Sequence, residues 1–248
     1  MTAMLFVHRC VRCVYGTLLV VVIFCGSASA QINVRPIKLL VPSQSRGEII
    51  TLSNIGQAPR KFEVLITAWR QQGQEDVLTP SEALIVSPPL FTLSPNKPQV
   101  LRVLRSGPPD ESKELSFRLL INEIVNEKVP GANGQPRLAL NMSLPVFLSP
   151  LTPTAPDYAI QLTDRALADP QSRRKLVIEN RGFVHVQSSQ LTLLKDNVEL
   201  GDSQALFGYA LPGESKVWEL DSSRLGAATA IRIRLTNGAV HDIALDAR

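Results

Sequence analysis

The sequence predicts an all-β protein made of two β-sandwich domains. Three observations lead to this prediction. From Gln31 onward, short runs with the pattern of β-strands alternate with clusters of turn residues such as Gly, Pro, Asn and Ser. No run keeps the period of a helix for more than a turn or two. The proline-rich segment Ser149–Pro156 divides the remaining chain into two halves of similar pattern.

The N-terminal residues 1–30 have the pattern of a secretory signal peptide. Basic residues at His8–Arg12 precede an apolar stretch at Val14–Cys25, and the small residues Ala28-Ser29-Ala30 follow. The apolar stretch is shorter than the roughly 20 residues of a transmembrane helix. We therefore expect cleavage after Ala30, a periplasmic location and no stable insertion into a membrane.

Cysteine usage and charge narrow the class of protein. All three cysteines lie in the predicted signal peptide, so the exported chain depends on its hydrophobic cores rather than on disulfides. Removal of Arg9 and Arg12 lowers the formal net charge of +4 by two, and no dense run of Lys or Arg remains. This argues against nucleic acid as a partner. The remaining chain is long enough for two domains of about a hundred residues each.

The expected strands of the first domain, residues 31–150, are short runs bounded by turn residues. They are Glu48–Leu52, Lys61–Trp69, Gln99–Leu104, Leu115–Ile124 and Leu138–Leu148. A polar, glycine-containing loop joins the last two runs, which predicts that they pair as a hairpin.

The proline-rich connector and the residues after it predict the second domain, residues 151–248. Prolines restrict the connector to extended conformations, so we expect a semi-rigid hinge that holds the two domains at a roughly fixed angle. The expected strands beyond it are Lys175–Ile178, Gln190–Leu194, Ser215–Leu220 and Ala230–Leu235.

The run Leu138–Leu148 is the most informative of these segments. Apolar residues occupy every second position and therefore project from one face of a strand. They are Leu138, Leu140, Met142, Leu144 and Val146. Pro145 cannot donate a hydrogen bond to a neighbouring strand, which places the run at a sheet edge. A long apolar edge strand is an aggregation hazard unless it is covered, so the sequence predicts that a partner covers this edge.

Residues for catalysis or metal binding are scarce. His185 and His241 are the histidines outside the predicted signal peptide, and His185 is interpreted as a structural position in the alternating run Phe183–Val186. A zinc or copper site needs three or four ligands, and the sequence has no cluster with suitable spacing. It also lacks a nucleophile elbow, a P-loop and a dinucleotide-binding fingerprint. We therefore predict no catalytic residues, no metal site and no cofactor.

Five segments together resemble the periplasmic pilus chaperones of the chaperone–usher pathway. Four of them follow the family's order in the first half, and the fifth is similar to the family's Asn-x-Gly-x-x-His-Val element. The segments are Gly47–Asn54, Pro88–Pro95, Leu101–Val103, Phe117–Ile124 and Glu179–Val186. The resemblance implies two immunoglobulin-like domains in a boomerang arrangement.

The resemblance also implies a function. Members of this family bind pilin or fimbrial subunits, block their premature polymerisation and deliver them to an outer-membrane usher. The last long strand of the first domain completes the subunit's unfinished sandwich, which is donor-strand complementation. On this chain the donated side chains would be Leu138, Leu140, Met142, Leu144 and Val146. The sequence leaves open whether the free protein self-associates to cover the same edge.

The resemblance assigns an anchor for the subunit's terminal carboxylate. The family usually provides an arginine on the first strand and a lysine on the donor strand. Here Lys38 aligns with the first position and Pro145 with the second, so this pair of cations is incomplete. The sequence is more similar to the divergent, archaic branch, in which an arginine on the preceding strand takes over. This implies Arg118 as the first candidate anchor and Lys38 as the second.

Two other classes of protein are alternatives. One is a secreted structural or adhesive β-sandwich protein, such as a surface subunit, but a subunit would usually have a single domain with an N-terminal donor extension. The other is a sandwich enzyme similar to copper–zinc dismutase, which requires more histidines than this chain has.

Overall fold

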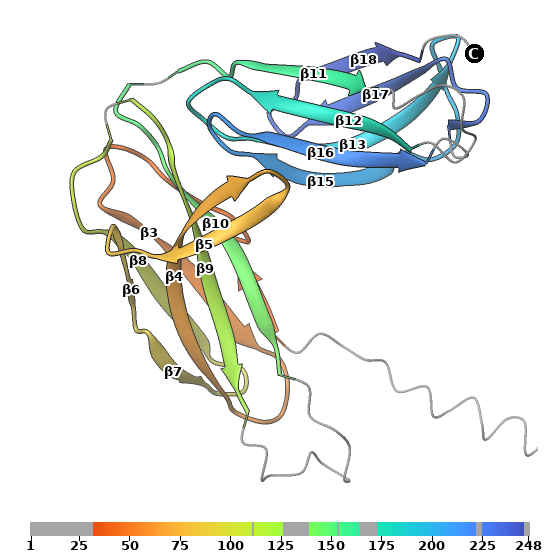
Figure 1. Cartoon of the computed structure of the whole chain (residues 1–248). Coiled ribbons are helices and arrows are strands. Elements are labelled where there is room, and N and C mark those ends of the chain that lie inside the picture. The colour runs from red at the N-terminus through yellow and green to blue at the C-terminus, as the bar shows by residue number, and fades with distance from the viewer. Residues whose placement is uncertain are drawn as a thin grey trace, which may run out of the picture.

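The protein consists of two β-sandwiches set at an angle to each other, as the computed structural model shows (Figure 1). The structure describes residues 32–110, 112–125, 139–152, 154–163, 173–221 and 225–245. The predicted signal peptide, residues 1–30, and the predicted donor residue Leu138 lie outside these residues. Almost all of the regular structure described is β-strand, which confirms the predicted fold class.

The first sandwich is formed by the strands between residues 32 and 148. They are β1 (Ile32–Arg35), β2 (Leu39–Val41), β3 (Gly47–Asn54), β4 (Arg60–Gln72), β5 (Glu75–Pro80), β6 (Leu84–Ser87), β7 (Leu90–Leu93), β8 (Pro98–Arg105), β9 (Leu115–Ile124) and β10 (Asn141–Leu148). One sheet has the order β1-β3-β8-β6, and the other has the order β2-β10-β9-β4-β5 with β7 also paired to β4. The first strand segment is therefore split between the two sheets, and β2 runs parallel to β10.

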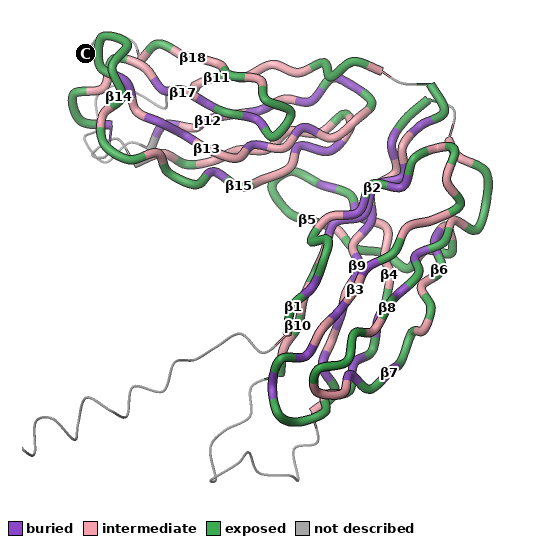
Figure 2. Tube along the Cα trace, turned by 180° about the vertical axis from the view of Figure 1, so that it is seen from behind, coloured by how far each residue is buried: buried purple, intermediate pink, exposed green. Residues whose placement is uncertain are grey.

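The core of the first sandwich lies between these two sheets. Alternate residues of β3, β8 and β9 are buried between the sheets, and the tube shows this alternation along the chain (Figure 2). Phe62 on β4, Ile50 on β3 and Leu119 on β9 are each fully buried there. Burial of each such side chain stabilises the fold by about 1.5–3 kcal/mol before entropic costs.

The second sandwich is formed by the strands between residues 158 and 244. They are β11 (Tyr158–Thr163), β12 (Arg173–Asn180), β13 (Val186–Lys195), β14 (Val198–Glu199), β15 (Gln204–Ala210), β16 (Ser215–Asp221), β17 (Ala230–Leu235) and β18 (Val240–Ala244). One sheet has the order β11-β12-β16, and the other has the order β14-β13-β17-β18 with β15 paired to β13. Leu176 on β12 and Ile231 and Ile233 on β17 are fully buried between them.

The same asparagine turn occurs once in each sandwich. Asn54 ends β3 and Asn180 ends β12, and both are 1% exposed. Each side-chain amide donates to the carbonyl four residues on and to a carbonyl of another segment, and each side-chain oxygen accepts from the backbone N–H two residues on. A Cβ atom on Gly182 would lie 2.9 Å from the backbone nitrogen of Asp157, so this turn requires glycine two residues after Asn180. These contacts explain the Asn-x-Gly part of the element at Glu179–Val186.

Each strand expected from the sequence is present, and β9 and β17 have the predicted bounds. The run Leu138–Leu148 differs, because β10 begins at Asn141 and Leu140 precedes it. β9 and β10 pair in an antiparallel arrangement, as the predicted hairpin requires. The sequence did not reveal the short or edge strands such as β2, β6 and β14, because two to four residues do not establish an alternating pattern.

Candidate functional site

Strand β10 has two halves with different surroundings. From Val146 to Leu148 it pairs with β9 on one side and with β2 on the other. From Asn141 to Pro145 it pairs with β9, and no other strand of the described chain covers its second side. This half of β10 is therefore an open sheet edge, in agreement with the sequence.

The side chains of the open half alternate between two environments. Leu140, Met142 and Leu144 are half-buried, and the last two pack against the margin of the first core. Asn141 and Ser143 point the other way and are exposed. We call the row Leu140, Met142 and Leu144 the apolar edge row.

Val146 differs from the apolar edge row although it lies on the same face. It is 0% exposed, and it belongs to the half of β10 that is paired on both sides. Val146 therefore fixes the base of the strand in the first sandwich rather than extending its open part.

A buried ion pair holds the start of the open edge. Glu123 on β9 forms a two-point ion pair with Arg60 on β4, in which the Nε–Oε1 distance is 2.8 Å. The same carboxylate accepts a hydrogen bond from the backbone N–H of Leu140 at 3.1 Å, and the N–H of Glu123 donates to the carbonyl of Leu140 at 2.9 Å. Both backbone polar groups of Leu140 thus face β9. The sequence analysis did not identify Glu123 or Arg60, because they are 63 residues apart.

The direction of these hydrogen bonds determines which groups the open edge offers. In an antiparallel pair, the backbone groups of successive residues alternate between the two sides of the strand. Since Leu140 faces β9, the N–H groups of Asn141 and Ser143 face outward, and Pro145 has no N–H to present there. Further along, Ser149 donates its N–H to the carbonyl of Val41, the last residue of β2, at 3.0 Å, which fits the same alternation. Pro145 lies where the covering by β2 ends.

Arg118, the first candidate anchor, lies on β9 beside the open edge. Its register partners are Pro145 on β10 and Thr67 on β4. Its guanidinium carbon lies 3.6 Å from the centroid of the Trp69 ring, in a cation–π arrangement. Burial lowers the pKa of Arg118 below its ordinary value and the nearby Asp76 opposes this shift, but an arginine remains charged in any protein environment. Arg118 is thus a fixed, partly desolvated cation with 16% of its side chain exposed.

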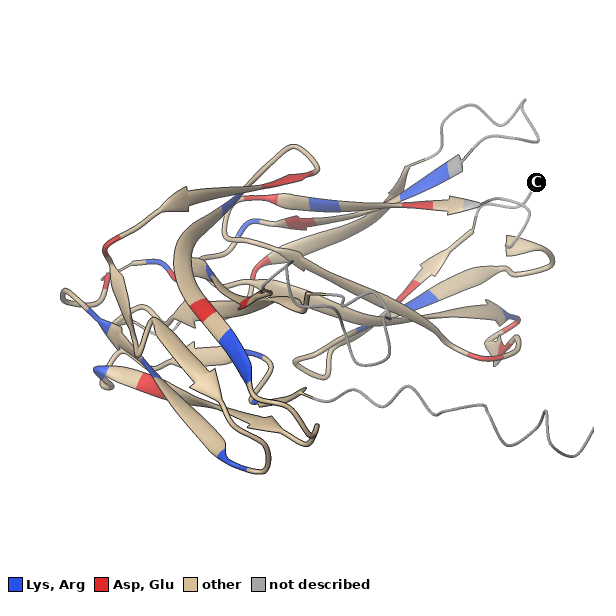
Figure 3. Ribbon diagram, turned by 90° about the horizontal axis from the view of Figure 1, so that it is seen from below, with Lys and Arg blue, Asp and Glu red and all other residues tan. Residues whose placement is uncertain are grey.

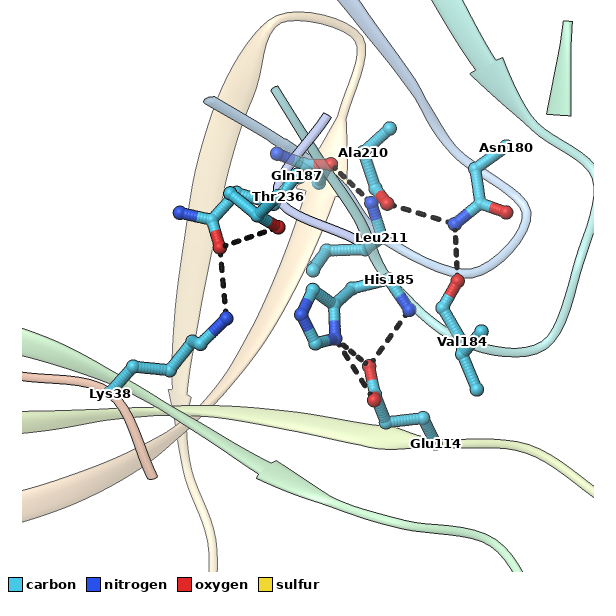
Figure 4. A network of polar contacts seen from close by, with 10 residues as sticks. Lys38, Glu114, Asn180, Val184, His185, Gln187, Ala210, Leu211 and Thr236 are labelled. Carbon is cyan, nitrogen blue, oxygen red and sulfur yellow. Dashed lines mark hydrogen bonds and ion pairs between the residues drawn. The ribbon is translucent and has the colours of Figure 1, made fainter. Parts of the chain in front are cut away.

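Lys38, the second candidate anchor, lies between β1 and β2. Its Nζ atom donates a hydrogen bond of 3.0 Å to the side-chain oxygen of Gln187 on β13 in the second sandwich (Figure 4). Gln187 is the register partner of Tyr209 on β15, whose ring centroid lies 6.0 Å from the guanidinium of Arg118. Both candidate cations therefore approach the same part of the second sandwich. Elsewhere on the strands, residues of both charge signs are interspersed (Figure 3).

An aromatic cluster joins the two sandwiches at this point. Trp69 on β4 and Phe147 on β10 are buried against Leu211 of the second sandwich, and Tyr209 packs beside them. The Phe147 ring is stacked on the His185 ring, with 3.7 Å between the centroids and an interplanar angle of 9°. Phe147 is the neighbour of Val146 in the fixed half of β10, so the same few residues hold both β10 and the second sandwich.

Buried polar side chains also connect the two sandwiches at this junction by hydrogen bonds. Glu114, just before β9, accepts from the backbone N–H of His185 at 3.0 Å, and its two oxygens lie 2.8 and 3.0 Å from His185 Nδ1 (Figure 4). A carboxylate only accepts hydrogen bonds, so Nδ1 is the donor in this contact. Gln71 on β4 donates to the carbonyl of Tyr209 at 2.9 Å and accepts from the N–H of Leu211 at 3.0 Å.

His185 thus has a role that the sequence analysis assigned only in part. The sequence indicated a structural position within a strand, but His185 lies just before β13, where its ring contacts Glu114 and Phe147 and connects the two sandwiches. Across the described residues, no group of three or more His, Cys, Asp or Glu side chains is arranged to hold a metal ion. None of the described helical structure is long and apolar enough to cross a bilayer.

Comparison with known proteins identifies the family. Residues 31–153 match the family of pili and flagellar-assembly chaperones, PapD N-terminal domain. The chain therefore belongs to the pilus-assembly chaperones. No curated protein sequence matches it.

Three solved structures show the same two-domain fold at low sequence identity. One is from the CsuC–CsuE chaperone–tip adhesion subunit pre-assembly complex of archaic Csu pili of Acinetobacter baumannii, with a TM-score of 0.64, 21% identity, and coverage of 86% of this chain and 97% of that chain. Another is from the complex of the Salmonella enterica SafA pilin with the SafB chaperone, with a TM-score of 0.60, 17% identity, and coverage of 89% of this chain and 99% of that chain. The third is the Pseudomonas aeruginosa CupB2 chaperone, with a TM-score of 0.53, 19% identity, and coverage of 86% of this chain and 100% of that chain.

Replacement of Glu114 by alanine tests the role of the junction. We expect both sandwiches to remain folded while the angle between them becomes variable, because the backbone N–H and the ring of His185 lose a buried acceptor. The loss of stability should be about 1–3 kcal/mol. Small-angle X-ray scattering should show a broader distribution of overall dimensions. The matched control is Glu63→Ala, an exposed position on β4. Identical scattering from wild type and Glu114→Ala would contradict this role.

Proposed function

We propose that the protein is a periplasmic chaperone that binds pilin or fimbrial subunits by donor-strand complementation. The observation that carries the proposal is the open half of β10, where a row of alternate apolar side chains accompanies an uncovered line of backbone hydrogen-bonding groups. Because the family is one of chaperones, we also propose that the chain has no catalytic activity and needs no cofactor.

The open edge provides what an incomplete sandwich lacks. The outward backbone groups of Asn141 and Ser143 pair with the edge strand of the subunit, and the apolar edge row enters its groove. Leu138, which lies outside the described residues, is proposed as a further donated side chain, because it continues the alternating apolar pattern of the sequence. Val146 holds the base of the strand. Each side chain gains less than the roughly 1.5–3 kcal/mol of full burial, since the row is already half-buried in the free protein, and ordering costs reduce this further.

Arg118 is the anchor that this proposal favours for the subunit's terminal carboxylate, with Lys38 as the second cation. A guanidinium binds a carboxylate through two parallel hydrogen bonds, and its position over Trp69 limits its freedom before binding. Lys38 has a neutral amide as its hydrogen-bond partner in the described structure, so its charge is available to an anion. One fixed end point sets the register of the subunit strand along β10, and therefore which side chains enter the groove.

Two of the solved relatives support the proposed partners. Their structures contain a chaperone together with a tip adhesion subunit in one case and the SafA pilin in the other. By analogy, we propose that this chain covers the groove of its subunits, prevents their premature polymerisation and delivers them to an outer-membrane usher. The family's usual pair of cations is incomplete in this chain, because Lys38 occupies one of the two positions and the uncharged Pro145 occupies the other. This favours the archaic branch. The proposal does not require self-association of the free chaperone through the same edge.

Charged substitutions in the apolar edge row test the donor strand. We expect Leu140→Asp and Leu144→Asp to abolish co-purification of a co-expressed pilin subunit, because an unpaired carboxylate cannot enter an apolar groove without a cost of several kcal/mol. The control is Asn141→Asp, which places the same charge on the exposed face of the same strand. A one-to-one complex with either leucine variant would refute the donor-strand proposal.

Replacement of Arg118 by alanine tests the anchor. Recovery of the subunit should fall roughly tenfold or more, because loss of a charge-assisted pair costs about 1.5–3 kcal/mol, while the chaperone itself stays folded. Arg102→Ala, which removes an exposed arginine from β8, serves as the control. The amount of subunit bound per chaperone is measured after affinity purification. Unchanged recovery with Arg118→Ala would remove Arg118 from the site.

We further propose that residues 1–30 are a cleaved signal peptide and that the two domains comprise residues 31–150 and 151–248. The basic, apolar and small-residue order at the N-terminus supports the cleavage site. N-terminal sequencing of protein recovered from the periplasm of an expressing bacterium should give Gln31 as the first residue. Retention of the N-terminal segment in that fraction would contradict export by cleavage.

A further inference from the structure

In the free protein, Arg118 already has a carboxylate beside it. The Nη2 atom of Arg118 lies 3.5 Å from Oδ2 of Asp76, which belongs to strand β5. The hairpin of β4 and β5 extends beyond the first sandwich toward the second (Figure 1). Asp76 keeps 43% of its side chain exposed, so it reaches the cation from the solvent side.

The position of Asp76 is set by the junction between the sandwiches. Its second oxygen, Oδ1, accepts a hydrogen bond of 3.3 Å from the side-chain amide of Gln71. That amide also donates to the carbonyl of Tyr209, and the N–H of Leu211 donates to the oxygen of Gln71. The tip of the same hairpin is held as well, because the N–H of Val217 donates to Gln74 at 3.1 Å. Asp76 is therefore held next to Arg118 by its hairpin partner Gln71, which is itself bonded to the second sandwich.

The contact between Asp76 and Arg118 is a weak one. Strong charge-assisted pairs have donor–acceptor distances of about 2.7–2.9 Å and often join a guanidinium to a carboxylate at two points. Here a single pair of atoms at 3.5 Å connects the two groups. The guanidinium also lies over the Trp69 ring, a contact that does not involve Asp76. A second carboxylate that binds Arg118 therefore needs to replace only the single contact with Asp76.

We propose that Asp76 is an internal stand-in for the subunit's terminal carboxylate, which competes for Arg118 and weakens the anchoring of bound subunits. This inference rests on the proposed role of Arg118 as the anchor. Two carboxylates that share one guanidinium repel each other, so a subunit carboxylate must displace Asp76 or bind beside it at a cost. A chaperone has to release its subunits again, and a weakened anchor serves that purpose.

The test uses four forms of the full-length exported chaperone. Asp76→Asn removes the charge but keeps a side-chain oxygen that accepts from Gln71. Glu75→Gln is the matched control, because it removes the same charge from the adjacent residue, whose side chain points to the opposite face of β5. Arg118→Ala and the wild type complete the set. The probe is a synthetic peptide with the C-terminal strand of a subunit that co-purifies with the wild type, prepared once as the free acid and once as the amide.

Asp76→Asn should bind the free-acid peptide about two- to fivefold more tightly than the wild type does, the range that corresponds to loss of one exposed charge interaction. The amidated peptide should bind Asp76→Asn and the wild type equally. Glu75→Gln should bind the free-acid peptide as tightly as the wild type does. Equal or weaker binding of the free acid by Asp76→Asn would overturn the role of Asp76, provided that Arg118→Ala loses the preference for the free acid. If Arg118→Ala keeps that preference, the proposed anchor itself is wrong.

Discussion

The short stretch of β10 from Val146 to Leu148 is the constraint on which the rest of the structure depends. It is paired on both sides, by β2 and β9, and its successive side chains point to opposite faces of the sheet. Val146 and Leu148 are part of the first core, whereas Phe147 stacks on His185 of the second sandwich. This stretch therefore holds the base of the open edge, the first sandwich and the junction at the same time.

This arrangement explains how a strand can stay open without unravelling. The fixed stretch anchors the open half at one end, and the buried Glu123–Arg60 pair holds it near the other through Leu140. Between these two points, the strand keeps its pairing with β9, while no strand of the described chain pairs with its second side. An extended, preorganised edge loses little conformational entropy when it binds, which favours β-augmentation.

The sequence could predict features that depend on local patterns. The alternation in Leu138–Leu148 predicted the open edge, and Pro145 predicted that the strand would lie at a sheet edge. The junction could not be predicted in this way, because its polar members are isolated residues whose partners are far along the chain. Glu114 is 71 residues from His185, and Gln71 is 140 residues from Leu211. The resemblance to the chaperone family pointed to His185 and Arg118, but Asp76 and Trp69 became visible only when the fold brought them to Arg118.

Amide hydrogen exchange on β10, measured with and without a bound pilin subunit, is the most direct test of the donor strand. In the free chaperone, the amides of Met142 and Leu144 should already exchange slowly because they face β9, whereas those of Asn141 and Ser143 should exchange fast. In the complex, the amides of Asn141 and Ser143 should become slow as well, because the subunit's edge strand pairs with them. Fast exchange of Asn141 and Ser143 in a stable complex would contradict donation of this strand.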